Sequence, residues 1–365
     1  MTLDEIRDRL SALDQQLLTL IAERQRLSSE VAEAKRSSGR ATRDFQRERH
    51  VLVQARSNAE ALGLSPDLAE SILRLLIRGS LTTQERIRVA AAGRGSGRPA
   101  LVIGGAGKMG RWFSEFLTSQ SYNVTIADPH GAVEGYAHVQ DWREGPLEYD
   151  FIVVATPLKV ADLVLQELAV RKPRGTIFDI GSLKTPLRQG INALRDAGCR
   201  VASIHPMFGP DTELLSGRHV IFIDCGHAQA LEDAQTLFAS TMAERVIMGL
   251  DEHDRLIAYV LGLSHALNIA FFTALAGSGE AAPRLAQLSS TTYDAQVDIA
   301  TKVSNESPDL YFEIQKLNEY GRDSLNALRD AVERLCSAVA AGESTEFAGL
   351  MQRGREYLAG RVREA

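Results

Sequence analysis

The segment from Leu101 to Asp128, LVIGGAGKMGRWFSEFLTSQSYNVTIAD, restricts the possible folds more than any other part of the chain. A short apolar run leads into a glycine-rich turn. Apolar residues at helical spacing follow, and a second apolar run ends at Asp128. This order predicts a strand, a tight turn, a helix and a second strand, the βαβ unit in which dinucleotides bind. The alternative is a glycine turn in a βαβ unit that holds no ligand.

Each glycine of this turn has a predicted role. Gly105 would permit the turn, Gly107 would let the backbone approach a pyrophosphate at the helix N-terminus, and Gly110 would let helix and strand pack closely. Asp128 lies where a carboxylate accepts the ribose hydroxyls and repels a 2′-phosphate. No arginine follows it, so we expect NAD rather than NADP. The predicted cofactor-binding residues are Gly105, Gly107, Lys108, Met109, Gly110 and Asp128 and, after the next strand, Thr156 and Pro157.

Length and composition restrict the class of protein. A chain of 365 residues is long for a single core, so we expect a multidomain protein. The N-terminus has no signal-peptide pattern and no stretch approaches eighteen uncharged apolar residues, so a cytoplasmic protein without a membrane segment is expected. Three scattered cysteines suggest neither a disulfide framework nor a metal site, and a net charge of −6 argues against binding nucleic acid.

The first ninety residues predict three helices. Apolar residues recur at alternating steps of four and three from Ile6 to Ala34, which indicates one long helix whose seam needs a partner helix. Arg24 interrupts this seam, and Lys35 follows about three turns later on the same face. An arginine that pairs with a carboxylate or reaches solvent is the simplest explanation. Two further helices are predicted after Gly39 and from Pro66 onward.

These helices resemble the all-helical chorismate mutase family, in which two chains interlock as a dimer and each site borrows one arginine from its neighbour. Arg7 in LDEIRDRL corresponds to the borrowed arginine and faces a different side of the helix from Arg24. All eight motif positions carry the residue types of the family. They are Arg7, Arg24, Lys35, Asp44, Arg47, Glu48, Ser80 and Gln84.

The resemblance implies that this segment rearranges chorismate to prephenate. A pericyclic reaction needs no nucleophile, only a dianion held in its compact conformer and charge stabilisation at the breaking ether oxygen. Lys35 and Gln84 would donate to that oxygen, Glu48 would accept from the substrate hydroxyl, and the arginines would bind carboxylates. Asp44, Arg47 and Ser80 would complete substrate binding. The alternative is that these helices only dimerise the protein.

Beyond the glycine-rich turn, apolar strands continue to alternate with helices, which predicts a mostly parallel, doubly wound sheet. Ligands bind at the carboxyl ends of such strands, where His205 follows the run Val201–Ile204. A lone histidine is usually structural. At a strand end in a dinucleotide fold, however, His205 is a candidate for taking the substrate's hydroxyl proton.

The run IHPMFGPD after DIGSLK resembles the prephenate dehydrogenases, particularly the form fused to a chorismate mutase. The resemblance implies that His205 contacts the ring hydroxyl of prephenate, with Ser182 and Lys184 near the nicotinamide and substrate. From Asp251 onward long helices are predicted, which in the family form the dimer interface and complete the substrate pocket. His265 matches a family histidine, although a core histidine fits as well. Lys302 stands where the family has an arginine for the prephenate carboxylate, and it lacks the bidentate fork.

We therefore expect a helical mutase domain over residues 1–91, a linker over 92–98, a Rossmann-type NAD domain over 99–249 and a helical dimerisation domain over 250–365. The predicted function is conversion of chorismate to prephenate and then, with NAD and without a metal, to 4-hydroxyphenylpyruvate by a cytoplasmic homodimer. One alternative is the same steps on 4-amino-4-deoxychorismate. Others are a dehydrogenase whose helical domain only dimerises, and an NAD-sensing regulatory protein.

Overall fold

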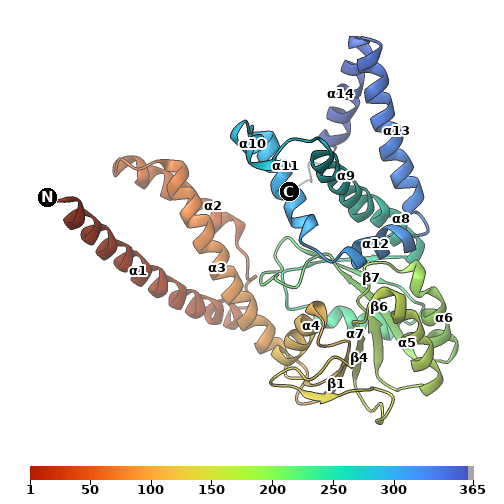
Figure 1. Cartoon of the computed structure of the whole chain (residues 1–365). Helices are drawn as coiled ribbons and strands as arrows, with labels where there is room; N and C mark the ends of the chain where they lie inside the picture. The colour runs from red at the N-terminus through yellow and green to blue at the C-terminus, as the bar shows by residue number, and fades with distance from the viewer. Residues whose placement is uncertain (361–365) are drawn as a thin grey trace. The chain divides into compact units, whose positions relative to one another are not determined.

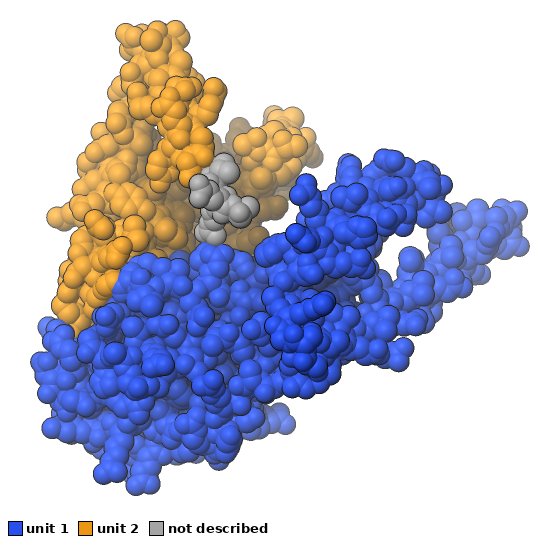
Figure 2. All heavy atoms as spheres, turned by 180° about the vertical axis from the view of Figure 1, so that it is seen from behind, with its two compact units in different colours: residues 1–181, 189–248 blue, residues 182–188, 249–365 orange. Residues whose placement is uncertain are grey.

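The computed structural model describes residues 1–360, and contacts divide the chain into two compact units (Figure 2). Unit 1 comprises residues 1–181 and 189–248. Unit 2 comprises residues 182–188 and the chain from Gly249 onward. A short segment within the predicted Rossmann domain therefore packs with the C-terminal helices. The two units are described separately below.

Unit 1 begins with three helices, α1 (Leu3–Ser37), α2 (Phe45–Ala61) and α3 (Pro66–Ala92) (Figure 1). Thr2 and Glu5 form a capping box at the start of α1, and Ser65 caps α3 ahead of a first-turn proline. The α1 seam remains exposed within one chain. Its exposed members include Leu10, Leu13, Leu17 and Leu20.

The small, glycine-rich composition of the segment after α3 predicts a flexible tether, but the segment is packed against the neighbouring turn and that prediction is wrong. The N–H of Gly95 donates to the Gln120 carbonyl at 2.9 Å, and that of Gly97 donates to the Ser121 carbonyl at 2.8 Å. A Cβ on Gly95 would lie 2.3 Å from the Ser121 carbonyl carbon. The glycines here permit close packing rather than free movement.

Glu85 of α3 also joins the helices to the sheet portion of unit 1. Its buried carboxylate accepts from the backbone N–H of Leu215 at 2.8 Å and from that of Met242. Burial raises the pKa of this carboxyl, while the two backbone donors act in the opposite direction. The end of α3 is therefore held by specific hydrogen bonds.

The remainder of unit 1 is built on one eight-stranded sheet with the order β3-β2-β1-β4-β5-β6-β7-β8. All neighbouring strands are parallel except β6 and β7, which confirms the predicted doubly wound, mostly parallel sheet. Sequence patterns did not predict β3, β7 or β8. The strands are β1 (Pro99–Ile103), β2 (Asn123–Ala127), β3 (Ala137–Val139), β4 (Phe151–Val154), β5 (Thr176–Asp179), β6 (Arg200–Pro206), β7 (His219–Ile223) and β8 (Glu244–Met248).

Helices cover both faces of this sheet. On one face α4 (Lys108–Ser119) and α7 (Ala228–Leu237) share an aromatic core, in which the Phe116 and Phe238 rings lie 4.8 Å apart. On the other, α5 (Leu158–Arg171) packs against α6 (Arg188–Asp196), where a Cβ on Gly190 would lie 2.5 Å from the Leu165 Cβ. This layering leaves the carboxyl ends of the parallel strands available for a ligand.

Unit 2 is helical and takes in one segment from between β5 and α6. That segment contains the 3₁₀ turn η1 (Thr185–Leu187). The other elements are α8 (Leu250–Ile257), the π-helical turn η2 (Ala258–Leu263), α9 (Ser264–Gly277), α10 (Ala282–Gln287), α11 (Thr291–Ser304), α12 (Pro308–Leu317), α13 (Gly321–Ala340) and α14 (Ser344–Ala359).

The continuous helical run Leu250–Gly277 is long and apolar enough, by length and composition, to cross a membrane. The expectation that no such stretch exists is therefore wrong, since no charged residue occurs from Leu256 to Gly277. Only 22% of its most apolar window is buried in one chain. An exposed apolar surface of this size marks a site of interaction, and the pairing of helices from two chains is one way to bury it.

Candidate functional site

Seven of the eight predicted mutase positions line one cavity of about 280 Å³ between α1, α2 and α3. They are Arg24, Lys35, Asp44, Arg47, Glu48, Ser80 and Gln84. The apolar part of the lining includes Leu27, Val31 and Val51. A small cavity with cations and hydrogen-bond donors set into apolar walls suits a compact dianion.

Arg24 is held in place from α3. Its Nη1 donates to the Ser80 hydroxyl at 2.8 Å and to the Leu76 carbonyl at 2.9 Å. Ser28, which the motif positions do not include, donates to the same Ser80 oxygen at 2.7 Å. Burial lowers the pKa of the Arg24 guanidinium. The ordinary pKa of arginine is so high that the side chain still carries its charge at neutral pH. The arginine on the seam is therefore fixed by hydroxyl and carbonyl oxygens rather than by a carboxylate.

Lys35 and Gln84 meet across α1 and α3. Lys35 Nζ lies 3.3 Å from Gln84 Oε1 and 2.5 Å from the carbonyl oxygen of Thr42. With its oxygen accepting from the lysine, Gln84 retains its amide N–H₂ as a donor. An ammonium and an amide N–H₂ group therefore lie side by side. Such donors can stabilise the negative charge that develops on an ether oxygen as its bond breaks.

The start of α2 supplies the remaining groups. Asp44 is the N-cap of α2 and accepts from the Arg47 N–H at 2.9 Å, so it has a structural role as well as a place in the cavity. Glu48 forms a two-point salt bridge with Arg43 at 2.9 and 3.0 Å. Arg43 was not predicted, because its position in a run of mixed charges gave no signal of this pairing.

Arg7 does not reach this cavity. It lies on the exposed N-terminal part of α1, and its Nη1 lies 3.3 Å from Asp4 Oδ1. The prediction that Arg7 serves the site of a second chain therefore stays a prediction.

The glycine-rich turn joins β1 to α4, which begins at Lys108 and continues with Met109. The positive φ of +83° belongs to Gly104, to which the motif assigned no role. Gly105 instead permits packing, because a Cβ there would lie 2.6 Å from an Ile126 methyl carbon on β2. The predicted turn role of Gly105 is therefore wrong. Gly110 has the predicted packing role, since its Cβ would lie 2.3 Å from the Gly104 carbonyl oxygen.

Asp128 is buried at the end of β2. Its Oδ2 accepts from the Ala106 N–H at 3.0 Å, and its Oδ1 accepts from the His130 N–H at 2.9 Å and lies 3.1 Å from the His130 Nδ1. These bonds fix the carboxylate against the glycine-rich turn. A carboxylate offers about four acceptor positions, so capacity for a ribose hydroxyl remains.

The residues present fit a dinucleotide. The helix N-terminus at Gly107 and Lys108 offers backbone N–H groups to a pyrophosphate, and Asp128 lies where a ribose is expected. Thr156, with Pro157 at the start of α5, follows β4. Its buried Oγ1 has no hydrogen-bond partner among residues 1–360. A buried hydroxyl without a hydrogen-bond partner at a strand end can form a hydrogen bond with a ligand.

His205 lies inside β6, which runs two residues further than the apolar run indicated, and its side chain is buried. Strands β1, β4, β5 and β6 are parallel neighbours, so their carboxyl ends lie at one edge of the sheet. The glycine-rich turn, Thr156 and His205 therefore share that edge, where a doubly wound sheet binds its ligand.

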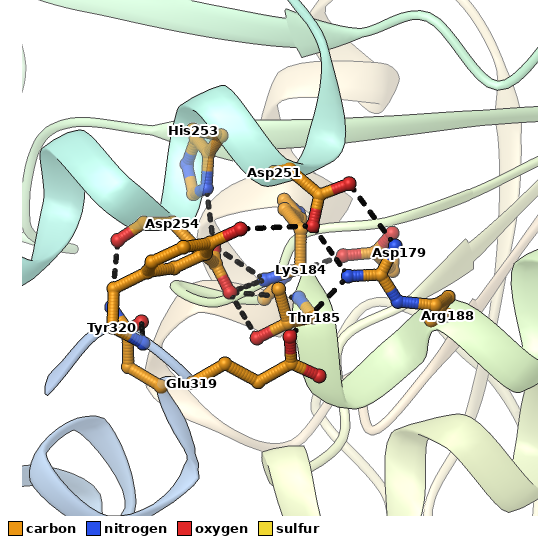
Figure 3. Close-up of polar contacts among 11 residues, drawn as sticks. Asp179, Lys184, Thr185, Arg188, Asp251, His253, Asp254, Glu319 and Tyr320 are labelled. Carbon is orange, nitrogen blue, oxygen red and sulfur yellow. Dashed lines mark hydrogen bonds and ion pairs between the residues drawn. The ribbon is translucent and has the colours of Figure 1, made fainter.

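Ser182 and Lys184 belong to unit 2, where Asp254 of α8 anchors their segment (Figure 3). Asp254 accepts from the Lys184 N–H at 2.9 Å, the Thr185 N–H at 2.7 Å and the Thr185 hydroxyl at 2.6 Å. His253 Nδ1 lies 2.6 Å from the same carboxylate, which is fully buried. Burial alone would raise the pKa of Asp254, but hydrogen bonds from His253 and Thr185 outweigh it and hold the pKa below its usual value. No sequence pattern indicated this anchor.

His265 and Lys302 lie elsewhere in unit 2. The His265 ring stacks on Tyr311 with centroids 4.1 Å apart, and its Nδ1 is buried without a partner among the described residues. Burial lowers the pKa of this imidazole. Lys302 lies on α11 and is exposed in one chain. Within residues 1–360 no cluster of histidine, cysteine and carboxylate groups could hold a metal ion.

Three family models match successive parts of the chain. Chorismate mutase type II matches residues 6–85 and the prephenate dehydrogenase nucleotide-binding domain matches residues 129–247. The prephenate dehydrogenase dimerization domain matches residues 250–353. The glycine-rich turn precedes the second match, so its assignment depends on geometry.

Individual relatives match most of the chain. The chain is 28% identical over 345 residues to a T-protein of Enterobacter agglomerans, covering 93% of this chain and 87% of that protein. It is 29% identical over 271 residues to the 4-amino-4-deoxyprephenate dehydrogenase of Streptomyces pristinaespiralis, covering 71% and 90%. The crystal structure of Aquifex aeolicus prephenate dehydrogenase with hydroxyphenyl propionate and NAD⁺ matches with a TM-score of 0.56 at 17% identity. That match covers 73% of this chain and 97% of that chain and shows a shared fold.

A mutase-type helical cavity joined to a dinucleotide-binding sheet and a dimerisation domain defines a bifunctional enzyme, an isomerase fused to an NAD-dependent oxidoreductase. The chain belongs to the family that joins type II chorismate mutase to prephenate dehydrogenase, the T-protein type. The predictions of both activities and of an NAD-binding domain are thereby confirmed.

Proposed function

We propose that the helical segment converts chorismate to prephenate and that the dehydrogenase converts prephenate, with NAD, to 4-hydroxyphenylpyruvate and CO₂. The observation that carries this proposal is that seven residues of the helical segment, matched to the family motif from sequence alone, line one cavity. The placement of the glycine-rich turn, Thr156 and His205 at one sheet edge supports the second step.

In the first step the chain supplies positioned charge. Arg24 and Arg47 bind the two carboxylates of the dianion, and Ser80 keeps the Arg24 guanidinium in place. Lys35 and the Gln84 amide donate to the ether oxygen as its bond breaks. Glu48 accepts from the substrate hydroxyl while Arg43 fixes its carboxylate. Arg7 of a second chain completes the site.

In the second step bound NAD supplies the hydride acceptor. His205 holds the ring hydroxyl of prephenate and takes its proton as the carbon is oxidised, and loss of the ring carboxylate then yields the aromatic product. Ser182, Lys184, His265 and Lys302 contribute to substrate binding, with the positive charge of Lys302 directed at a carboxylate.

We further propose that the protein is a homodimer in the cytoplasm, and two exposed apolar surfaces support the dimer. The dimerisation-domain match coincides with the exposed apolar run Leu250–Gly277, and the α1 seam is a second exposed apolar surface. Covering both surfaces by a second copy would also bring Arg7 to a neighbouring mutase cavity.

A single assay tests the proposal. Purified protein is mixed with chorismate and NAD, NADH formation is followed, and the product is identified. NADH together with 4-hydroxyphenylpyruvate is the expected result. NADH from added prephenate but not from chorismate would reduce the helices to a dimerising role.

A second candidate is the amino series, in which 4-amino-4-deoxyprephenate is oxidised to 4-aminophenylpyruvate. Two observations favour it: Lys302 replaces the family's arginine, and one relative of similar identity is a 4-amino-4-deoxyprephenate dehydrogenase. Comparing kcat/KM for the hydroxy and amino substrates decides between the two series. A preference for the amino substrate that Lys302→Arg reverses would establish the second candidate.

A further inference from the structure

A second cavity adjoins the mutase cavity and shares two residues with it. This cavity, here called the outer cavity, has a volume of about 290 Å³. Lys35 and Gln84 line both cavities and so form the wall between them. The other lining residues are Ala32, Arg36, Gly39, Arg40, Thr42, Arg88, Ala91 and Ala92.

The outer cavity is lined by one sign of charge. All four of its charged residues are cations, namely Lys35, Arg36, Arg40 and Arg88. The mutase cavity, in contrast, combines three cations with the carboxylates of Asp44 and Glu48. In a protein with a net charge of −6, four cations around one small cavity form a local concentration of positive charge.

Two of these cations are positioned through Thr42, which is buried. Its hydroxyl accepts from Arg88 Nη1 at 3.0 Å and its carbonyl accepts from Lys35 Nζ at 2.5 Å. A guanidinium has five N–H donors, so Arg88 retains most of its capacity. Arg36 pairs with Glu33, and Arg88 also interacts electrostatically with the buried carboxylate of Glu85. Arg40 and Arg88 are nevertheless the two cations of the cavity, besides Lys35, that form no direct salt bridge with a carboxylate among the described residues.

We infer that the outer cavity is an anion subsite for a small dicarboxylate, through which the mutase's own dianionic substrate reaches Lys35. The inference rests on the proposed mutase function. It assigns Arg40 and Arg88 a binding role that the eight motif positions do not include. A dianion held there raises the substrate concentration beside Lys35 without contact between Arg40 or Arg88 and the breaking bond.

The kinetic test uses the full-length protein and the variants Arg88→Gln and Arg40→Gln. Each is expected to raise the KM for chorismate by about threefold to tenfold at low ionic strength, with kcat within about twofold of wild type. The difference should shrink as salt screens the charges. Arg88→Lys, which keeps the charge, should restore most of kcat/KM.

Arg49→Gln is the matched control, because Arg49 is an exposed cation of the same helical segment that lines neither cavity. If the Arg40 and Arg88 variants behave like this control, the inference is wrong. A lower kcat at unchanged KM would also overturn it, since these arginines would then act on the reacting bond.

A binding measurement separates this inference from the proposed function. Succinate, a dicarboxylate that cannot rearrange, is titrated calorimetrically at low salt into wild type, Arg24→Ala and the double variant Arg24→Ala/Arg88→Gln. Succinate should bind the Arg24→Ala protein and fail to bind the double variant. If the wild-type protein shows no mutase activity but succinate binding still depends on Arg88, the subsite is sustained and the mutase assignment is refuted. Equal binding by both variants would refute the subsite.

Discussion

The two halves of this enzyme build their sites in different ways. The mutase cavity is made by three sequential helices, whose side chains already hold one another through contacts such as Arg24 with Ser80 and Lys35 with Gln84. The residues predicted for the dehydrogenase are instead scattered along the chain, at strand ends of unit 1, in the segment 182–188 and on helices of unit 2. The mutase positions can therefore be read from local helical spacing, whereas the dehydrogenase positions depend on how distant segments fold.

Replacing His205 tests whether the two halves act separately, and it should give the largest effect. We expect His205→Asn to lower dehydrogenase turnover by about 10²- to 10⁴-fold, because proton transfer from the hydroxyl is lost. Mutase activity and NAD affinity should stay near wild type. NADH formation from prephenate, chorismate consumption and NAD titration measure the three quantities. A fully active variant would remove His205 from the mechanism.

Replacing Arg24 should impair the mutase and leave the dehydrogenase active. Removing a guanidinium that binds a substrate carboxylate should lower mutase kcat/KM by about 10²-fold or more, while NADH formation from prephenate is retained. Arg49→Ala, an exposed arginine outside the cavity, is the control. Unchanged mutase activity and chorismate binding in Arg24→Ala would mean that the helices have no catalytic role.

Replacing Asp254 tests how much its hydrogen bonds to the segment 182–188 contribute to stability. Asp254→Asn weakens the bonds to Lys184 and Thr185 and should destabilise the protein by about 2 kcal/mol at pH 7. The carboxylate has a pKa below its unfolded value. Its contribution is therefore present above about pH 4 and is lost as the pH falls through the lower folded pKa.

Denaturant unfolding at a series of pH values measures this difference. Asp251→Asn is the matched control, because Asp251 pairs with Arg188 at the surface and should contribute much less. Equal destabilisation by both variants, or a difference that does not depend on pH, would contradict the role of Asp254.

The smallest expected effect concerns cofactor choice. Asp128→Ala should reduce the preference for NAD over NADP by about tenfold, because an acceptor for ribose hydroxyls and a repulsive charge are both removed. The ratio of kcat/KM values for the two cofactors is the measurement, and mutase activity serves as the internal control. An unchanged ratio would show that Asp128 only supports the glycine-rich turn through Ala106.

Sequence patterns predicted the mutase cavity better than they predicted the dehydrogenase site, for a physical reason. Helical periodicity fixes which side chains share a face, so residue spacing alone pairs Arg24 with Lys35 and Ser80 with Gln84. The dehydrogenase depends on long-range contacts. No spacing rule connects Asp254 with Lys184, and the role of Gly104 follows from its backbone conformation rather than from the motif.

The segment 182–188 also determines how this enzyme can be divided or recombined. The chain passes between the two units at residues 181 and 182, 188 and 189, and 248 and 249. Truncation after Met248 would therefore strip the Asp254 acceptor from the backbone donors of Lys184 and Thr185. A junction near residue 93 would likewise strip the Glu85 acceptor from the backbone donors of Leu215 and Met242. Division at either place leaves buried backbone donors without their carboxylate acceptors, so separated parts would need substitutions that satisfy these donors.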